Sequence, residues 1–155
     1  MGTRGLYGFK KNDVEKVTYC HYDSYPDYLG RHISQFIMAT SPKEMSEIFD
    51  KIIMVDDNKK ATDEQVAECL KYADTSVGAQ NANDWYCLLR DTQGNLFPYK
   101  EDLRYMLDGS MYGGIEYIYL IDLDSNTLIV ADGGGDILKE IPLDKVDESW
   151  VDTVS

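Results

Sequence analysis

The sequence contains few cysteines, few histidines and few basic residues, and each shortage excludes a class of protein. Its three cysteines, Cys20, Cys69 and Cys87, are odd in number and widely spaced, without a CxxC pair. We therefore expect free, buried thiols in a reducing compartment rather than a disulfide framework. Two histidines and scattered cysteines lack the ligand spacing of a structural zinc site, so we expect no metal and no cofactor.

Basic side chains and long apolar runs are also scarce. Lys and Arg number 15 against 28 Asp and Glu, which gives a formal net charge of −13. Phosphate contacts require Lys and Arg, so this balance opposes direct binding to nucleic acid or to an anionic membrane. No apolar run approaches the roughly 20 residues of a membrane-spanning helix, and the first residues lack the basic-then-apolar order of a signal peptide. We expect a cytoplasmic protein.

Acidic residues gather toward the end of the sequence. Residues 122–155 contain nine acidic and two basic side chains. Such a surface suits a protein partner with a basic surface, although plain solubility explains it too. The candidate partner-binding residues are Asp122, Asp124, Asp132, Asp136, Asp144, Asp147 and Glu148.

Strand patterns occupy both ends of the chain. The predicted strands are Leu6–Lys10, Val14–Tyr22, Glu116–Leu123, Thr127–Ala131 and an edge strand Ile137–Leu143 that carries Pro142. Tight turns are expected at Asn12-Asp13 and at Asp124–Asn126. An isolated hairpin is marginal in water, so we expect residues 116–123 to pair with one of the first two strands.

Helix patterns fill the middle. Apolar residues repeat at helical spacing from Leu29 to Ile37. Ser41–Glu44 is a capping box, and the helix after it is expected to turn Met45, Ile48, Phe49, Ile52 and Ile53 inward. A second box, Thr62–Gln65, opens a helix with Val66, Cys69, Leu70 and Ala73 inward, and a short helix is expected from Trp85 toward a stop at Gly94.

These patterns predict the fold class. Strands at both ends with helices between them indicate a single α+β domain over residues 1–155. Its mostly antiparallel sheet is formed by the N- and C-terminal strands, with three to four helices packed on it. Residues 145–155 are expected to form a loosely ordered acidic tail.

A polar segment, Thr18–Gly30, is the main candidate site. His21 and Asp23 fall on one face of the expected strand, about 7 Å apart by strand spacing. Cys20 and His21 point to opposite faces, which argues against a Cys-His nucleophile pair. The candidate ligand-binding residues are Arg4, His21, Asp23 and Tyr25. Alternatively the segment is structural, with Asp23 or Ser24 capping the next helix and tyrosine hydroxyls bonding backbone groups; Asp27 is a further cap candidate.

Four segments carry a resemblance to a known family. They are Thr3-Arg4, Tyr19–Pro26 with Leu29-Gly30, Asp84–Arg90 with Gln93-Gly94, and Glu116–Asp122. Together they resemble a family of uncharacterised proteins of phages, prophages and bacteria. Those proteins begin Met-Ser-Thr-Arg and carry a Tyr-x-His-x-Asp-Gly-Tyr-Pro block. Here Gly2 stands in place of the serine and Ser24 in place of the glycine. The resemblance implies a phage-type setting without an established activity.

Two functions from different classes follow. The first is a non-enzymatic, phage-type protein that inhibits a host factor, such as a nuclease defence system, in the manner of anti-CRISPR proteins. The second is a small enzyme or a nucleotide- or small-ligand-binding protein that uses the His21, Asp23 and Tyr25 junction with Arg4. A degenerate N-terminal-nucleophile hydrolase is one form of it, but Gly2 has no side chain for attack. Acidic groups gathered on one face favour the inhibitor, and an even spread with a pocket at Arg4, His21 and Asp23 favours the ligand site.

Overall fold

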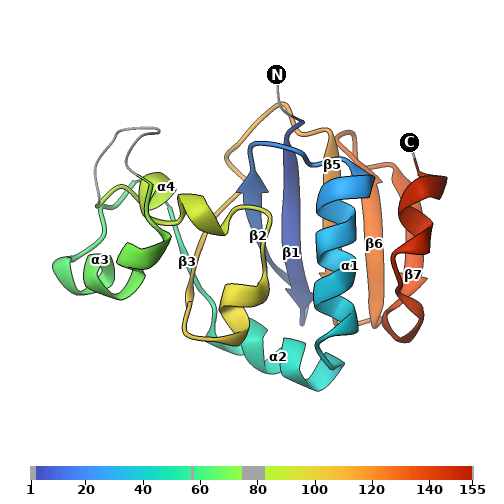
Figure 1. Ribbon diagram of the computed structural model, residues 1–155, viewed down its shortest axis with the longest axis horizontal. Coiled ribbons are helices and arrows are strands. Elements are labelled where there is room, and N and C mark those ends of the chain that lie inside the picture. Colours follow the sequence, from blue (N-terminus) through green and yellow to red (C-terminus); the bar gives the residue numbers. More distant parts are fainter. Residues whose placement is uncertain (1–2, 57, 75–82, 155) are drawn as a thin grey trace.

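Five strands from the two ends of the chain form the main sheet of this protein. The structure is a computed structural model that describes residues 3–56, 58–74 and 83–154. The strands are β1 (Gly5–Lys11), β2 (Val14–Cys20), β5 (Tyr117–Asp122), β6 (Thr127–Asp132) and β7 (Ile137–Pro142). Their order is β2-β1-β5-β6-β7 (Figure 1). All neighbours pair antiparallel except β1 and β5, which are parallel. This confirms the predicted fold class and the predicted pairing of residues 116–123.

The β1–β2 turn forms where the sequence predicts it. Asn12 and Asp13 have φ values of 53° and 62°. Two successive residues of positive φ match the right-handed twist of the strands on either side, and Asn and Asp tolerate this conformation better than most residues. The second hairpin, β5–β6, also turns at the predicted residues.

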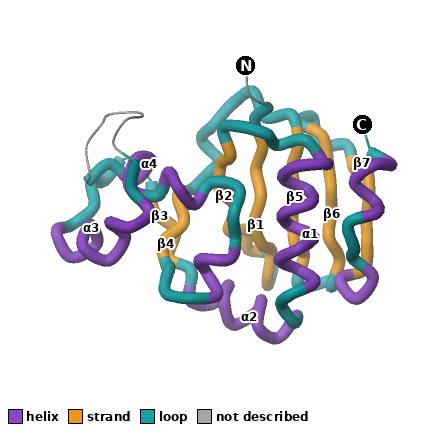
Figure 2. Tube along the Cα trace, viewed as in Figure 1, coloured by secondary structure: helices purple, strands orange, loops and turns teal. Residues whose placement is uncertain are grey.

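The core lies on the face of the sheet that α1 (Arg31–Met38) covers (Figure 2). Strand register brings Phe9, Ile121 and Leu128 into one row across the sheet, all with 0% exposure. Phe36 of α1 packs edge-on against Phe9, with ring centroids 6.0 Å apart. Alternate residues of each strand therefore supply the apolar face that a helix must cover.

The predicted helices form, with two errors in their inward faces. The helix α2 (Pro42–Lys51) begins at the Ser41 capping box and α3 (Asp63–Cys69) at the Thr62 box. Ile53, predicted to face inward, is 43% exposed, because the helix ends and residues Ile53–Val55 become strand β3. Leu70, also predicted inward, is 56% exposed, because the backbone tightens to a 3₁₀ turn after Cys69. The short helix α4 (Trp85–Leu88) is confirmed.

A small second sheet lies beside β2. It pairs β3 in parallel with β4 (Tyr105–Leu107). β4 lies within residues 96–114, where apolar residues and turn residues alternate in the sequence. The Gly109 amide donates to the carbonyl of Val17 over 3.0 Å, so the chain after β4 is attached to the main sheet. No described helix has both the length and the apolar character needed to cross a membrane.

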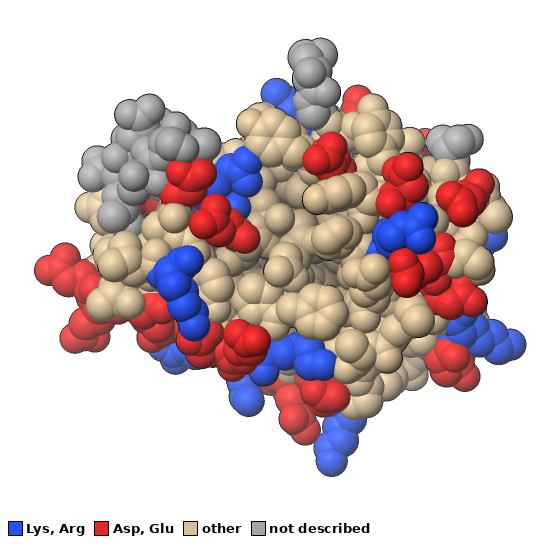
Figure 3. Space-filling model, viewed as in Figure 1, with Lys and Arg blue, Asp and Glu red and all other residues tan. Residues whose placement is uncertain are grey.

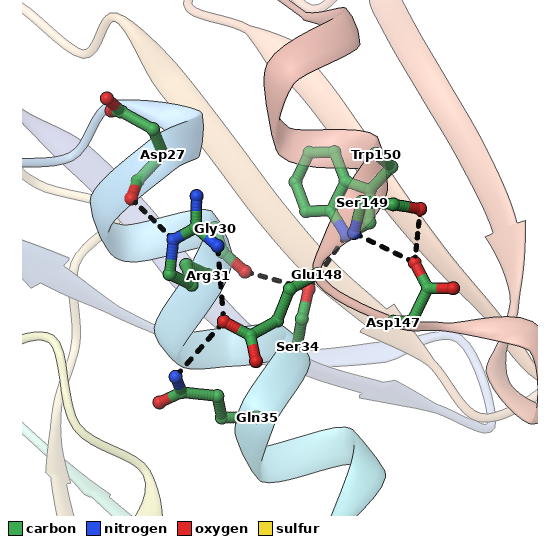
Figure 4. A network of polar contacts seen from close by, with 9 residues as sticks. All are labelled: Asp27, Gly30, Arg31, Ser34, Gln35, Asp147, Glu148, Ser149 and Trp150. Carbon is green, nitrogen blue, oxygen red and sulfur yellow. Dashed lines mark hydrogen bonds and ion pairs between the residues drawn. The ribbon is translucent and has the colours of Figure 1, made fainter.

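The C-terminal residues are packed, which corrects the expectation of a loose tail. Ser149–Thr153 forms a 3₁₀ helix in which Trp150 and Val151 are buried. The Trp150 indole donates to Ser34 Oγ over 2.7 Å (Figure 4). Glu148 accepts from Arg31 at 3.2 Å and from Gln35 at 3.3 Å. The last turn of the chain is thus fixed to α1.

Candidate functional site

The polar segment after β2 does not continue as a strand. β2 ends at Cys20, and Asp23 has a φ of 52°. The buried Ser24 hydroxyl donates to the carbonyl of Cys20 over 3.3 Å. The Ser24 carbonyl accepts a hydrogen bond from the Tyr119 hydroxyl over 2.7 Å. The prediction that His21 and Asp23 share a face is therefore wrong, because the period of two holds only for extended backbone.

His21 lies with Tyr19. The Tyr19 hydroxyl and Nδ1 of His21 share a hydrogen bond of 2.7 Å, and Tyr19 stacks on Tyr112 with ring centroids 4.2 Å apart. Burial lowers the pKa of His21, and the charges of Arg4 and Arg90 lower it further. The lowered pKa favours the neutral imidazole, which shares a hydrogen bond with a tyrosine.

The predicted set of four ligand-binding residues is not assembled. Arg4 lies near Tyr19 and His21, since its charge bears on both pKa values. Tyr25 is the N-cap of a π-helical turn, Pro26–Gly30, and leans toward Tyr117 with ring centroids 6.0 Å apart. Asp27 lies inside that turn and is the N-cap neither of it nor of α1. Among the four predicted residues, Asp23 lines a cleft.

That cleft lies between α1 and the segment of residues 90–97, and we call it the α1 cleft. Its volume is about 440 Å³, within the usual range for small-molecule sites. Cys20 and Leu29 contribute two buried side chains to its lining. Figure 3 shows this face of the molecule: uncharged atoms surround the hollow at its centre, and charged side chains lie mainly around them.

Three aromatic rings line the α1 cleft with much of their surface open. Tyr22 is 47% exposed, Tyr28 is 51% exposed and Phe97 is 38% exposed. Phe97 packs edge-on against Phe36, with centroids 5.5 Å apart, and Tyr28 leans on His32 at 4.8 Å. Large rings held in place by neighbours, with one side open, offer a ligand apolar contact area at little cost in conformational entropy.

The wall formed by residues 90–97 is fixed by a buried tyrosine. Tyr7 on β1 donates to the carbonyl of Thr92 over 3.1 Å and accepts from the Gly94 amide over 2.8 Å. Gln93 Oε1 accepts from the backbone amide of His21 at 2.9 Å. Gly94 has a φ of +83°, a conformation that favours glycine. This wall is therefore attached to both β1 and the end of β2.

Two opposite charges line the same cleft. Arg90 lies over the ring of Tyr22, 5.0 Å from the centroid. Its Nε is buried and lacks a hydrogen-bond partner among the described residues. Asp23 is exposed at the cleft. Sequence reasoning missed Arg90 as a site residue, although a single charge directly after the apolar run from Trp85 to Leu89 was the available signal.

The thiol and imidazole groups near the cleft do not form a nucleophilic pair. Burial raises the pKa of Cys20, whose Sγ lies 3.1 Å from the carbonyl of Tyr22. A protonated thiol is a poor nucleophile. His21 is bonded to Tyr19. Within residues 3–56, 58–74 and 83–154, no three His, Cys, Asp or Glu side chains gather in a way that could hold a metal ion.

The predicted partner-binding acids separate between the two ends of the sheet. Asp122 and Asp124 flank the β5–β6 turn, and Asp132 and Asp136 flank the β6–β7 turn at the other end of β6. Asp144 follows β7, whose last residue pairs with Thr127 at the first end. These five acids lie at two different ends of the sheet, so the predicted set of seven does not form one cluster.

Most of these carboxylates also bind the protein's own backbone. Asp124 accepts from the amides of Asn12 and Asp13 at 2.7 and 3.1 Å, which lowers its pKa. Asp122 accepts from the amide of Asp124, and Asp132 from that of Asp136. Asp147 accepts from Ser149, and Glu148 from α1 (Figure 4). These acids shape turns and fix the C-terminal segment.

Comparisons with known proteins identify no relative of this chain. No protein-family model, curated protein or solved structure matches this chain. The fold and the cleft define an α+β domain with an open, aromatic and charged hollow, and the resemblance to phage proteins stays a prediction.

Proposed function

We propose that this chain is a non-enzymatic binding protein whose α1 cleft holds a small organic ligand. The observation that carries the proposal is the cleft itself, a hollow of about 440 Å³ lined by open aromatic rings and by Arg90, whose Nε has no hydrogen-bond partner among the described residues. Apolar walls with a few convergent polar groups are typical of ligand sites.

Binding explains this arrangement better than catalysis. The buried Cys20 thiol has a raised pKa, and the His21 imidazole is bonded to Tyr19. Covalent catalysis needs an activated nucleophile within reach of a base. The rings, amides and charges of the cleft instead serve to recognise a ligand.

A matched pair of variants tests the proposal. Tyr28 and Tyr25 lie three residues apart and are both 51% exposed, but only Tyr28 lines the cleft. The purified chain is screened by NMR against a library of amino acids, nucleotides, sugars and aromatic acids. Tyr28→Ala should weaken a hit roughly tenfold through the lost ring contact, and Tyr25→Ala should leave it unchanged. Equal loss in both variants, or no compound that shifts cleft signals, refutes the proposal.

The acidic surface supports a second candidate, the inhibitor of a host nuclease defence system. The observation in its favour is the net charge of −13, which suits a basic nucleic-acid channel. Asp136 and Asp144 are exposed, so reversing them to Lys avoids the turn-forming carboxylates. Inhibition of guided nucleases should weaken with rising salt and disappear in the double variant. Inhibition that stays flat with ionic strength excludes a nucleic-acid mimic.

A further inference from the structure

Asp23 and Arg90 are two opposite charges that line the α1 cleft and form no ion pair with another described residue. Elsewhere, Arg31 reaches Glu148 at 3.2 Å and Arg104 reaches Glu68 at 2.9 Å. No ion pair within the described part of the chain includes Asp23 or Arg90. A charge lining a hollow without a partner is available to a ligand of opposite charge.

Arg90 is arranged to receive an anion. Its guanidinium carbon lies over the Tyr22 ring, 5.0 Å from the centroid, and its Nε is a buried donor without a partner in the described residues. A planar guanidinium binds a carboxylate through two parallel hydrogen bonds. The contact with Tyr22 and the burial of Nε restrict the position of this group before a ligand arrives.

Two amide side chains in the same wall supply further donors. Gln93 Oε1 accepts from the amide of His21 at 2.9 Å, and Asn95 Oδ1 accepts from the amide of Phe97 at 3.0 Å. Because these bonds engage the oxygens, the NH₂ groups are the ends left for other contacts. Both residues line the cleft.

Asp23 gives the cleft its opposite charge. Its carboxylate and the Arg90 guanidinium both act on the buried Cys20 thiol, in opposite directions. A dianionic phosphate would meet Arg90 but would be repelled by Asp23. A ligand that carries both a cation and a carboxylate matches the pair.

We propose that the α1 cleft binds a zwitterionic aromatic α-amino acid. Its carboxylate pairs with Arg90, its ammonium pairs with Asp23, and its ring packs against Tyr28 and Phe97. This inference rests on the proposed ligand-binding function and specifies the chemical class of the ligand.

Titration calorimetry with the full chain tests it through analogues that each lack one feature. L-tyrosine and L-phenylalanine are compared with tyramine, which lacks the carboxylate, with 3-(4-hydroxyphenyl)propionate, which lacks the ammonium, and with glycine, which lacks the ring. AMP represents the phosphate-bearing ligands. We expect binding of at least one of the two amino acids and a loss of about tenfold or more for each matched analogue.

Variants connect that selectivity to the two charges. In Arg90→Gln, the amino acid should no longer bind more tightly than tyramine. In Asp23→Asn, it should no longer bind more tightly than 3-(4-hydroxyphenyl)propionate. Arg104→Gln and Asp102→Asn, which lie outside the cleft, serve as controls. Asp23 is exposed, so its variant keeps the test valid if the Arg90 variant unfolds.

The outcomes separate this inference from the proposed function. If AMP or an uncharged aromatic compound binds in the cleft at least as tightly as the amino acids, the inference of a zwitterionic ligand is wrong and the proposed binding function stands. If binding of the amino acids is unchanged in both Asp23→Asn and Arg90→Gln, the zwitterion is also wrong. If no compound shifts the cleft signals in NMR, both are overturned.

Discussion

Single polar side chains hold the cleft in shape. Tyr7 is 1% exposed, yet its hydroxyl makes two hydrogen bonds to the chain between Thr92 and Gly94. Tyr119 likewise bonds the carbonyl of Ser24 at the junction. Buried hydroxyls of this kind are costly to leave unpaired, so each specifies one position for the loop that it contacts.

Tyr7→Phe should lower the free energy of unfolding by about 1–3 kcal/mol, because it leaves the Gly94 amide without its partner and removes one of the two donors to the Thr92 carbonyl, which keeps the Asn95 amide. It should also lower the affinity of the α1 cleft for any ligand, since Arg90 and Gln93 lie on the wall that Tyr7 holds in place. Chemical denaturation and calorimetry measure the two effects. Tyr119→Phe, which loses one bond at the junction, is the comparison. A Tyr7→Phe protein with unchanged stability contradicts the expectation.

His21 should make stability depend on pH. Its pKa lies below the ordinary value of 6.5 in the folded protein, first through burial and then through Arg4 and Arg90. The unfolded chain therefore binds the proton more readily than the folded protein does. The contribution of His21 to the free energy of unfolding is fully present above pH 6.5 and is lost as the pH falls through the lowered pKa. The stability difference between the protein and its His21→Gln variant should shrink from pH 8 to pH 5. A difference that grows over that interval rules this out.

At the scale of elements, α2 is defined at both ends. The Ser41 capping box begins it, and Lys16 of β2 donates to the carbonyls of Phe49 and Ile52 at 2.7 and 2.8 Å. The same ammonium lies 4.4 Å from the centroid of the Phe49 ring. A cation at the C-terminal end of a helix also complements its dipole.

Phe49→Ala should therefore cost about 3–5 kcal/mol, because a buried ring leaves a cavity and Lys16 loses a partner. Phe49 is 6% exposed, whereas Met38 of α1 is 56% exposed. Met38→Ala should change stability by less than about 0.5 kcal/mol. Denaturant unfolding of the two variants measures both values, and a Phe49→Ala loss below about 1 kcal/mol contradicts the packing seen here.

At the scale of the whole molecule, the N-terminal and C-terminal parts of the chain pack against each other. β1 pairs with β5, and the C-terminal turn packs on α1. A Cβ atom on Gly30 would lie 2.7 Å from the Trp150 ring and 3.1 Å from Tyr119, so only glycine permits this approach.

Trp150→Ala should cost about 3–5 kcal/mol, since it empties the contact with Gly30 and leaves Ser34 Oγ without its indole donor. Thermal and denaturant unfolding measure the loss. Val154→Ala, one turn later and only partly buried, should cost much less. A Trp150→Ala protein as stable as the parent would support the loose tail that the sequence suggested.

The local elements were readable from the sequence. The capping boxes at Ser41 and Thr62, the Asn12-Asp13 turn and the two hairpins depend on residues within a few positions of one another. Period and turn chemistry therefore predict them. The charge balance was equally plain from composition.

Only the tertiary structure decided the rest. The parallel pairing of β1 with β5 joins residues more than a hundred positions apart. Asp23 and Arg90 are also distant in the sequence, and both line the α1 cleft. The backbone at Asp23 is left-handed, and Asp23 lines the α1 cleft whereas His21 does not. Whether a charge serves a turn, as Asp124 does, or stands open to a ligand depends on which distant groups reach it, and no local pattern encodes that.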